Sequence, residues 1–253
     1  MPIHQSRDRE GAVLFKNLDP SPDREGGAAP GNALDALIEG ANALIAHVLS
    51  AGGRPCVTSS FQAECMVLVH LVTRALPDIP VLFLDTGYHF AETYAYRDQT
   101  SASMKLNLVN LLPKQTVAEQ EAQFGILYGS APDQCCAKRK VEPLFQAIAG
   151  YDVWFTALRR EQSPTRANLK ADDDFKRPGG QAVRKVSPLA AWTTKDVWNY
   201  LKRYEIPLLP LYEKGFSSIG CEPCTALPAD PNNPRSGRWA GHKVECGIHI
   251  AEK

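Results

Sequence analysis

The stretch Pro55-Cys56-Val57-Thr58-Ser59-Ser60-Phe61-Gln62-Ala63-Glu64-Cys65 joins a short apolar segment directly to a segment of helical periodicity. We expect a strand over Pro55–Ser59 and a helix over Ala63–Leu76. Three further apolar segments alternate with helix-period segments, at Val81–Leu84, Leu106–Leu111 and Val153–Leu158. Strands that alternate with helices indicate βαβ units, whose strands pair in parallel. The sequence therefore predicts an α/β fold, an open and mainly parallel sheet flanked by helices.

The chain divides into three parts around this pattern. Residues 1–31 carry prolines and glycines among charges and predict a flexible leader. Residues 32–205 form the nucleotide-binding α/β domain, which opens with an amphipathic helix capped by Asn32. From Ile206 onward Pro, Gly and Cys punctuate the sequence, so residues 206–253 predict an irregular C-terminal tail packed on the same domain.

Three more helix starts carry residues of the capping type. Thr116 and Glu119 have the spacing of a capping box. Asp133 is a candidate cap for the helix that bears two adjacent cysteines, and Thr194 for a helix over Lys195–Tyr204.

Composition and charge narrow the class of protein. The 253 residues are 44% hydrophobic, and 28 Lys plus Arg balance 28 Asp plus Glu. A chain without net charge has no general field for nucleic acid or an anionic membrane, so we expect neither partner. No uninterrupted apolar run reaches the roughly 18 residues that span a bilayer, and the N-terminus lacks a signal-peptide core. We expect a cytoplasmic protein.

Polar residues follow two of the predicted strands. Ser59 and Ser60 come after the first, and Asp85, Thr86 and Gly87 after the second. Ligands of open α/β sheets bind at the carboxyl ends of strands, where hydroxyls and helix N-terminal amides hold anions. One such loop alone is more often a plain turn, but two at neighbouring strand ends favour a nucleotide cleft.

Arginines gather in two places. Arg159, Arg160 and Arg166 follow the fourth predicted strand, and Arg235 and Arg238 lie in the tail. In a chain of zero net charge such groups suit a phosphate or sulfate, which a guanidinium binds through paired hydrogen bonds. The alternative for any one of them is a solvated basic turn.

Seven cysteines in a chain of this length point to metal or catalysis rather than to a disulfide framework. Cys135 and Cys136 are adjacent, and Cys221 and Cys224 form a C-x-x-C pair. Consecutive helical residues diverge by about 100°, so a cubane with separate irons suits Cys135 and Cys136 better than one zinc ion does. Zinc, a disulfide and plain core packing stay open as alternatives.

Cys246 stands alone in Glu245-Cys246-Gly247-Ile248-His249, near the end of the sequence. A thiol there is reachable from solvent. Glu245 disfavours its thiolate, whereas Lys243, His242, His249 and nearby arginines favour it, so these neighbours leave the direction of the net effect open. The alternative is that Cys246 is an incidental cysteine of the tail without a catalytic role.

Five motifs, spread roughly from Cys56 to His249, resemble in their order one family: the phosphoadenylyl- and adenylyl-sulfate reductases of the adenine nucleotide α-hydrolase-like superfamily. They are Leu84-Asp85-Thr86-Gly87, Cys135-Cys136-Ala137-Lys138-Arg139-Lys140-Val141-Glu142-Pro143-Leu144, Arg159-Arg160-Glu161-Gln162-Ser163-Pro164-Thr165-Arg166, Ser218-Ile219-Gly220-Cys221-Glu222-Pro223-Cys224-Thr225 and Glu245-Cys246-Gly247-Ile248-His249.

The resemblance implies that the four paired cysteines hold one [4Fe-4S] cluster and that Cys246 is the nucleophile. Members with both cysteine pairs typically use adenylyl sulfate, and those without them phosphoadenylyl sulfate. The remaining site residues carried over are a modified phosphate loop, a basic residue between cluster and substrate, and an anion-binding tail: Ser59, Ser60, Lys140, Arg235, Arg238 and His249.

The activity expected on this basis is the thiol-dependent reduction of adenylyl sulfate to sulfite and AMP, through an S-sulfocysteine on Cys246, in sulfate assimilation and cysteine biosynthesis. Reduction of sulfate to sulfite takes two electrons, which two thiols supply when they form a disulfide. Because the sequence carries no thioredoxin-like domain of its own, we expect thioredoxin or glutaredoxin as a separate partner; a homo-oligomer is compatible with the sequence.

Two departures and two rival functions accompany this interpretation. Cys65 stands where relatives often carry Asp or Ser, and a Trp-rich run before the last motif is shortened to Arg238-Trp239-Ala240-Gly241-His242. An ATP pyrophosphatase of the same superfamily would carry a glycine-rich S-G-G-x-D-S loop, which is missing here. A cysteine-cluster sensor or zinc module would leave Cys246 without a role.

Overall fold

In a computed structural model the described residues are 30–176, 180, 182–230, 233–241, 243 and 245–249. They form one six-stranded sheet in the order β3-β2-β1-β4-β6-β5. The strands are β1 (Pro55–Thr58), β2 (Pro80–Leu84), β3 (Asn107–Leu111), β4 (Val153–Phe155), β5 (Asp172–Lys176) and β6 (Ala182–Val186). All neighbouring pairs are parallel except β5 with β6. The predicted α/β class with a mainly parallel sheet is confirmed.

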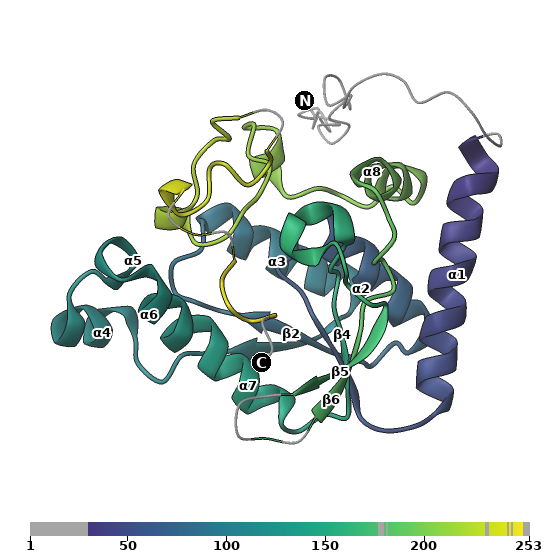
Figure 1. Cartoon of the computed structure of the whole chain (residues 1–253), viewed down its shortest axis with the longest axis horizontal. Helices are drawn as coiled ribbons and strands as arrows, with labels where there is room; N and C mark the ends of the chain where they lie inside the picture. The colour runs from purple at the N-terminus through teal and green to yellow at the C-terminus, as the bar shows by residue number, and fades with distance from the viewer. Residues whose placement is uncertain are drawn as a thin grey trace, which may run out of the picture.

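Helices flank the sheet, as Figure 1 shows. They are α1 (Pro30–Ser50), α2 (Ala63–Ala75), α3 (Ala91–Met104), α4 (Val117–Phe124), α5 (Leu127–Ser130), α6 (Pro132–Cys136), α7 (Glu142–Ile148) and α8 (Thr194–Arg203). A π-helical turn, Ala137–Val141, joins α6 to α7. The short helices α4, α5 and α6 lie together at the left-hand edge of Figure 1.

Alternating strand residues build two apolar layers, because successive side chains of a strand point to opposite faces. Val57, Phe83 and Phe155 pack with α1, α2 and α8 in the larger layer. Cys56 and Trp154 pack with α7 in the smaller layer. The sheet is therefore covered on both faces, as parallel sheets require.

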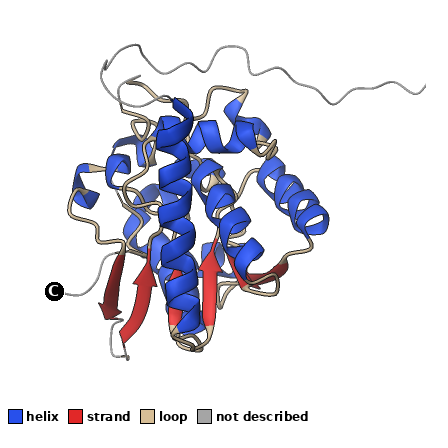
Figure 2. Ribbon diagram, turned by 90° about the vertical axis from the view of Figure 1, so that its right-hand side faces the viewer, coloured by secondary structure: helices blue, strands red, loops and turns tan. Residues whose placement is uncertain are grey.

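Helix α1 belongs to the larger layer. Figure 2 shows it standing in front of the strands. Its segment Ala33–Ser50 is long and apolar enough to cross a membrane by length and composition. Ile38, Ala41 and Ile45 are nevertheless buried in the protein core. The apolar stripe of α1 is thus accounted for by packing on α2 and α8.

The helix starts partly follow the capping residues. The box of Thr116 and Glu119 is present at α4, as predicted. At α8 the cap is Thr193, which pairs with Asp196, so the prediction of Thr194 was wrong by one residue. Asp133 does not cap α6; it accepts a hydrogen bond from Lys243 instead.

The N-terminal boundary also shifts. The leader expected over residues 1–31 lies outside the described residues, except for the last two positions. These begin α1 at Pro30, so Asn32 lies inside the helix and the predicted cap was wrong. Proline is tolerated in the first turn because its φ is already helical and no intrahelical partner is needed for its nitrogen.

The hairpin β5–β6 was not predicted. Its first strand begins with Asp172, Asp173 and Asp174, which look like a solvated loop in the sequence. An edge strand tolerates them because one of its sides faces solvent. The C-terminal segment after α8 contains only short 3₁₀ turns and isolated bridges among its described residues, in agreement with the predicted irregular tail.

Candidate active site

A cleft of about 850 Å³ opens at the carboxyl ends of β1, β2 and β4. β1 pairs in parallel with β2 on one side and with β4 on the other. The chain passes from β1 to β2 on one side and crosses from β3 to β4 on the other, and open α/β sheets bind ligands at such a switch point. Ser59, Ser60, Thr156 and Leu158 line the cleft directly after their strands.

The loop between β1 and α2 is held in one conformation. Phe61 has a φ of 57°, in the left-handed region that non-glycine residues rarely adopt. Its ring is fully buried against Phe83 and Tyr96, and its N–H donates to Ser59 Oγ at 3.1 Å. Burial of this ring offsets the backbone strain. The loop after β1 thus keeps its conformation although it lacks the two glycines that a pyrophosphate-binding loop carries.

The same loop is tied to the segment after α8. The Tyr212 hydroxyl accepts a hydrogen bond from Ala63 N at 3.0 Å, at the start of α2. Gln62 Oε1 accepts one from Ile219 N at 2.9 Å, just before Cys221 in the chain. The irregular tail therefore forms the second wall of the cleft.

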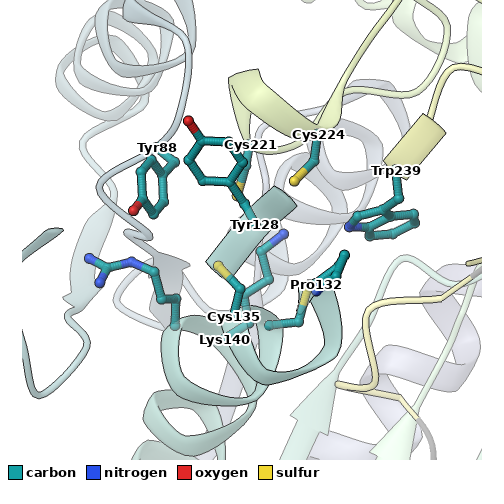
Figure 3. A pocket seen from close by; sticks show the side chains of 10 residues that line it. Tyr88, Tyr128, Pro132, Cys135, Lys140, Cys221, Cys224 and Trp239 are labelled. Carbon is teal, nitrogen blue, oxygen red and sulfur yellow. The ribbon is translucent and has the colours of Figure 1, made fainter. Parts of the chain in front are cut away.

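The two cysteine pairs line one pocket beside the cleft. Cys135 and Cys136 come from α6, and Cys221 and Cys224 from the tail. Figure 3 shows the sulfurs of Cys135, Cys221 and Cys224 turned toward the same space as the Lys140 amine. All seven cysteines are free thiols. No three His, Cys, Asp or Glu side chains of the described residues are placed to share a single metal ion.

Lys140 lines both the cysteine pocket and the cleft. Burial opposes its charge, but the sulfurs of Cys221, Cys246 and Cys136 outweigh this effect and raise the pKa of Lys140. Burial likewise opposes the thiolate of Cys221, yet Lys140 and a hydrogen bond with Thr86 Oγ1 at 3.2 Å lower the pKa of Cys221. A lysine ammonium therefore stands between the paired cysteines and Cys246.

Arg238 is a second desolvated cation at this boundary. Its side chain is held by Thr225 Oγ1 and lies over the Trp239 ring, 4.5 Å from the centroid. Gly220 makes room for it, since a Cβ at that position would overlap the guanidinium. Among the described residues no carboxylate forms an ion pair with Arg238 or Lys140. Two desolvated positive charges are thus left to face the thiols and the cleft.

Cys246 lines the cleft in a docked C-terminal segment. Glu245 pairs with Arg166, at 2.7 Å between Oε2 and Nη2, and both side chains are 13% exposed. Glu245, which was expected to disfavour the Cys246 thiolate, thus forms an ion pair with Arg166, which was expected to bind an anion. Arg235 also lines the cleft, and burial lowers its pKa.

His249 docks three residues further on. Its ring stacks on Trp154, with centroids 5.4 Å apart and planes at 19°. Its carbonyl accepts a hydrogen bond from Lys185 Nζ at 3.4 Å. Burial, with Lys185 and Arg166 nearby, holds the pKa of the imidazole well below its usual range. His249 is therefore neutral at physiological pH.

Several residues proposed from the sequence lie outside the cleft or have side chains bound to other parts of the protein. Asp85 accepts from Tyr94 at 2.7 Å, and Thr86 and Gly87 lie toward the cysteine pocket, beside Cys221 and Arg139. Arg160 is exposed and donates to the Leu169 carbonyl. Arg159 lines the cleft, but its guanidinium donates to Glu161, Trp192 O and Thr194 Oγ1.

Lys185 was missed in the sequence. It lies on β6 in register with Trp154, so both side chains share the face that carries the smaller apolar layer. It is 9% exposed, the only lysine in the buried set of described residues, and its ammonium lies over the Trp154 and Phe175 rings. Burial, followed by the charge of Arg166, lowers the pKa of Lys185 to about 8. The only feature of the sequence that could have indicated this site is a lysine within the strand Ala182–Val186.

Comparison with known proteins identifies relatives. The family model of the phosphoadenosine phosphosulfate reductase domain matches residues 54–227. Curated proteins named adenosine 5′-phosphosulfate reductase are 48% identical over 201 residues in Streptomyces coelicolor (78% of this chain, 83% of the relative) and 46% identical over 202 residues in Geobacillus kaustophilus (76% and 82%).

Solved structures share the fold. A phosphoadenylyl-sulfate reductase from Candida auris superposes with a TM-score of 0.65 at 21% identity, over 80% of this chain and all of that one. Yeast FAD synthetase, at 16% identity, superposes with a TM-score of 0.59 over 81% and 71% of the two chains. At these identities the structural similarity concerns the fold alone.

Replacing Lys185 by Met should stabilise the protein at pH 7. Between about pH 8 and 10.5 the unfolded chain keeps a proton that the folded chain has lost, so stability rises with pH there and the buried charge is destabilising below pH 8. We expect Lys185→Met to raise the free energy of unfolding at pH 7 by about 1–3 kcal/mol. Urea melts at pH 7 and pH 9.5 would measure this.

The exposed Lys176 on the neighbouring strand β5 is the matched control, since Lys176→Met should change stability by less than about 0.5 kcal/mol. A gain of Lys185→Met that stays constant between the two pH values would contradict the assigned cause.

Proposed function

Because the chain belongs to the phosphoadenosine phosphosulfate reductase domain family, we propose that it reduces adenylyl sulfate to sulfite and AMP. The named relatives support this substrate, since they are called adenosine 5′-phosphosulfate reductases at 44–48% identity. The observation that supports this proposal most directly is that Cys246, Lys140 and Arg238 line one cleft at the switch point of the sheet. A thiol flanked by desolvated cations suits attack on a sulfur that bears negative oxygens.

In the proposed reaction the Cys246 thiolate attacks the sulfur of adenylyl sulfate. The bond from that sulfur to the phosphate oxygen breaks, and AMP leaves as a stable anion without a general acid. Cys246 then carries an SO₃ group. Lys140, Arg235 and Arg238 stabilise the negative oxygens in this step, and Ser59 and Ser60 hold the nucleotide phosphate.

A dithiol partner completes the turnover. One thiol of thioredoxin or glutaredoxin attacks the Cys246 sulfur and releases sulfite, which leaves a mixed disulfide. The second thiol of the partner resolves it and frees Cys246. The two electrons come from the partner's thiols, so the proposed route requires no flavin or nicotinamide.

The four paired cysteines are the proposed ligands of a [4Fe-4S] cluster. The donor set fits, because four thiols from α6 and the tail line one pocket and face desolvated cations rather than carboxylates. Thiolates that bind separate irons need not converge on one point, as ligands of a single zinc ion must. When bound, the cluster would order Lys140 and adjust the field at the sulfate.

We assign the protein to sulfate assimilation and cysteine biosynthesis in the cytoplasm. A 3′-phosphate on the substrate is the second candidate, since the matched domain is described for phosphoadenosine phosphosulfate reductases. Sulfite release from the two nucleotides under the same assay separates them.

Protein purified without oxygen should be brown and hold about four irons per chain. Cys224→Ser should lose iron, sulfide and activity together, because a hard hydroxyl replaces a soft thiolate. Cys65→Ser is the matched control for iron content, since Cys65 lines the cleft and not the cysteine pocket. Stoichiometric zinc without sulfide would overturn the cluster.

Replacing Arg238 by Ala should weaken adenylyl-sulfate binding by about 1.5–3 kcal/mol, the effect of losing a hydrogen bond to a charged group. Arg54→Ala removes an exposed arginine that pairs with Asp152 and should leave binding unchanged. Calorimetric titration would compare the two. Equal affinities would move the anion site away from Arg238.

Replacing Cys246 by Ser should keep the cluster and nucleotide binding but abolish sulfite release, because a serine hydroxyl is hardly ionised at neutral pH. Wild-type protein given adenylyl sulfate without reductant should release about one AMP per chain in a burst. The tryptic peptide 244–253 should then gain the mass of one SO₃ group, which thioredoxin removes. A burst without that mass, or sulfite from the serine variant, would refute the covalent route.

A further inference from the structure

We propose that Lys185, together with Trp154, forms the seat that docks the His249 end of the C-terminal segment and so positions Cys246 in the cleft. Lys185 is a positioning residue for the nucleophile. This inference rests on the proposed function for the role of Cys246, but the docking itself is a property of the protein without substrate.

At one end of the segment, Glu245 is held by side chains that follow β4. Glu245 accepts from Arg166 at 2.7 Å and from Thr165 Oγ1 at 3.3 Å. Arg166 also donates to Gln162, whose amide donates to Glu64 at the start of α2. A chain of polar contacts therefore connects Glu245 to the helix that follows β1.

The His249 end is fixed on the sheet. Trp154 offers its face to the His249 ring and is itself held by a hydrogen bond from Nε1 to Thr58 Oγ1 at 2.9 Å. Ile248 packs into the apolar layer that contains Trp154. Lys185 donates to the His249 carbonyl at 3.4 Å, and its ammonium lies 5.2 Å from the Trp154 centroid. Figure 1 shows the yellow C-terminal end of the described chain descending to the sheet.

Lys185 is unfavourable for the fold taken alone. It stands among apolar side chains, and no ion pair with a carboxylate is present for it among the described residues. An apolar side chain of similar length would pack there without the desolvation penalty of a charge. Lys185 is also outside the set of residues that line the cleft. Its hydrogen-bond partner in the segment is the His249 carbonyl, so Lys185 contacts the tail directly.

Cys246 lies between the two fixed ends. Gly247, with a φ of 94°, lets the backbone turn after it, and a Cβ at that position would meet the Val141 side chain at 3.5 Å. With Glu245 and His249 both held, the thiol is directed to the cleft that Lys140 and Arg238 also line. Docking thus reduces the freedom of the nucleophile before substrate arrives, which favours attack.

The test compares Lys185→Met, Lys185→Arg and the control Lys176→Met in the full-length protein that retains its iron. Without substrate, iodoacetamide should label Cys246 roughly 10-fold faster in Lys185→Met, as expected for the loss of one hydrogen bond from a charged group. Labelling is followed on peptide 244–253. Lys185→Arg keeps the charge and should restore slow labelling, and Lys176→Met should match wild type.

Kinetics give the second readout. Lys185→Met should release AMP in the single-turnover burst roughly 10-fold more slowly at saturating adenylyl sulfate, with a Kd within about 2-fold of wild type, because the contact is to the tail and not to the substrate. Discharge of the S-sulfocysteine by thioredoxin should not slow.

Wild-type labelling and burst rates in Lys185→Met would overturn the proposal. A weakened Kd with a full burst at saturation would also overturn it, since Lys185 would then contact the substrate. Trp154→Phe tests the same seat if Lys185→Met does not fold, and unchanged labelling in that variant would likewise refute docking on Trp154. Failure of the proposed function, seen as no AMP burst in wild type, would leave the labelling result to decide the docking by itself.

Discussion

The parallel pairing of β1 with both β2 and β4 is the constraint on which the rest of the molecule depends. Because the chain passes from β1 to β2 on one side and returns later to β4 on the other, a crevice is left at the carboxyl end of β1. The loop with Ser59 and Ser60, the segment after β4 and the C-terminal tail therefore meet at one place. The tail forms the other wall of the cleft, and Tyr212 and Ile219 attach it by hydrogen bonds to the start of α2.

Desolvated positive charge gives this edge its chemistry. Lys140 comes from the π-helical turn after Cys136, and Arg238 comes from the tail beside Gly220. Neither has a carboxylate ion pair among the described residues, so their charge is directed at sulfur atoms and at the cleft. An arrangement of this kind is destabilising unless negative charge is bound there. Positive charge thus faces the paired cysteines on one side and the cleft on the other.

The fold was predictable because it depends on local patterns, and so was the gathering of the motif cysteines at one edge of the sheet. The strands β1 to β4 are apolar segments of the right length, and the cysteine pairs and Cys246 stand in quoted motifs. The hairpin β5–β6 escaped because Asp172–Asp174 hide an edge strand. Partnership across long sequence distances was also hidden: Arg166 could be recognised as a cation, but its pairing with Glu245 depends on where the tail docks.

The burial of Lys185 was hidden in the sequence for the same reason, and this burial affects stability. A lysine in the strand Ala182–Val186 reads as a solvent-facing residue, yet register with Trp154 turns it toward the smaller apolar layer. That register follows from the parallel pairing of β4 with β6, which the sequence pattern of either strand does not contain. Once the side chain is buried, its charge opposes folding and its hydrogen bond to the His249 carbonyl favours docking of the tail. Stability and the position of Cys246 then make opposite demands on one residue, as is common where a fold supports a reactive group.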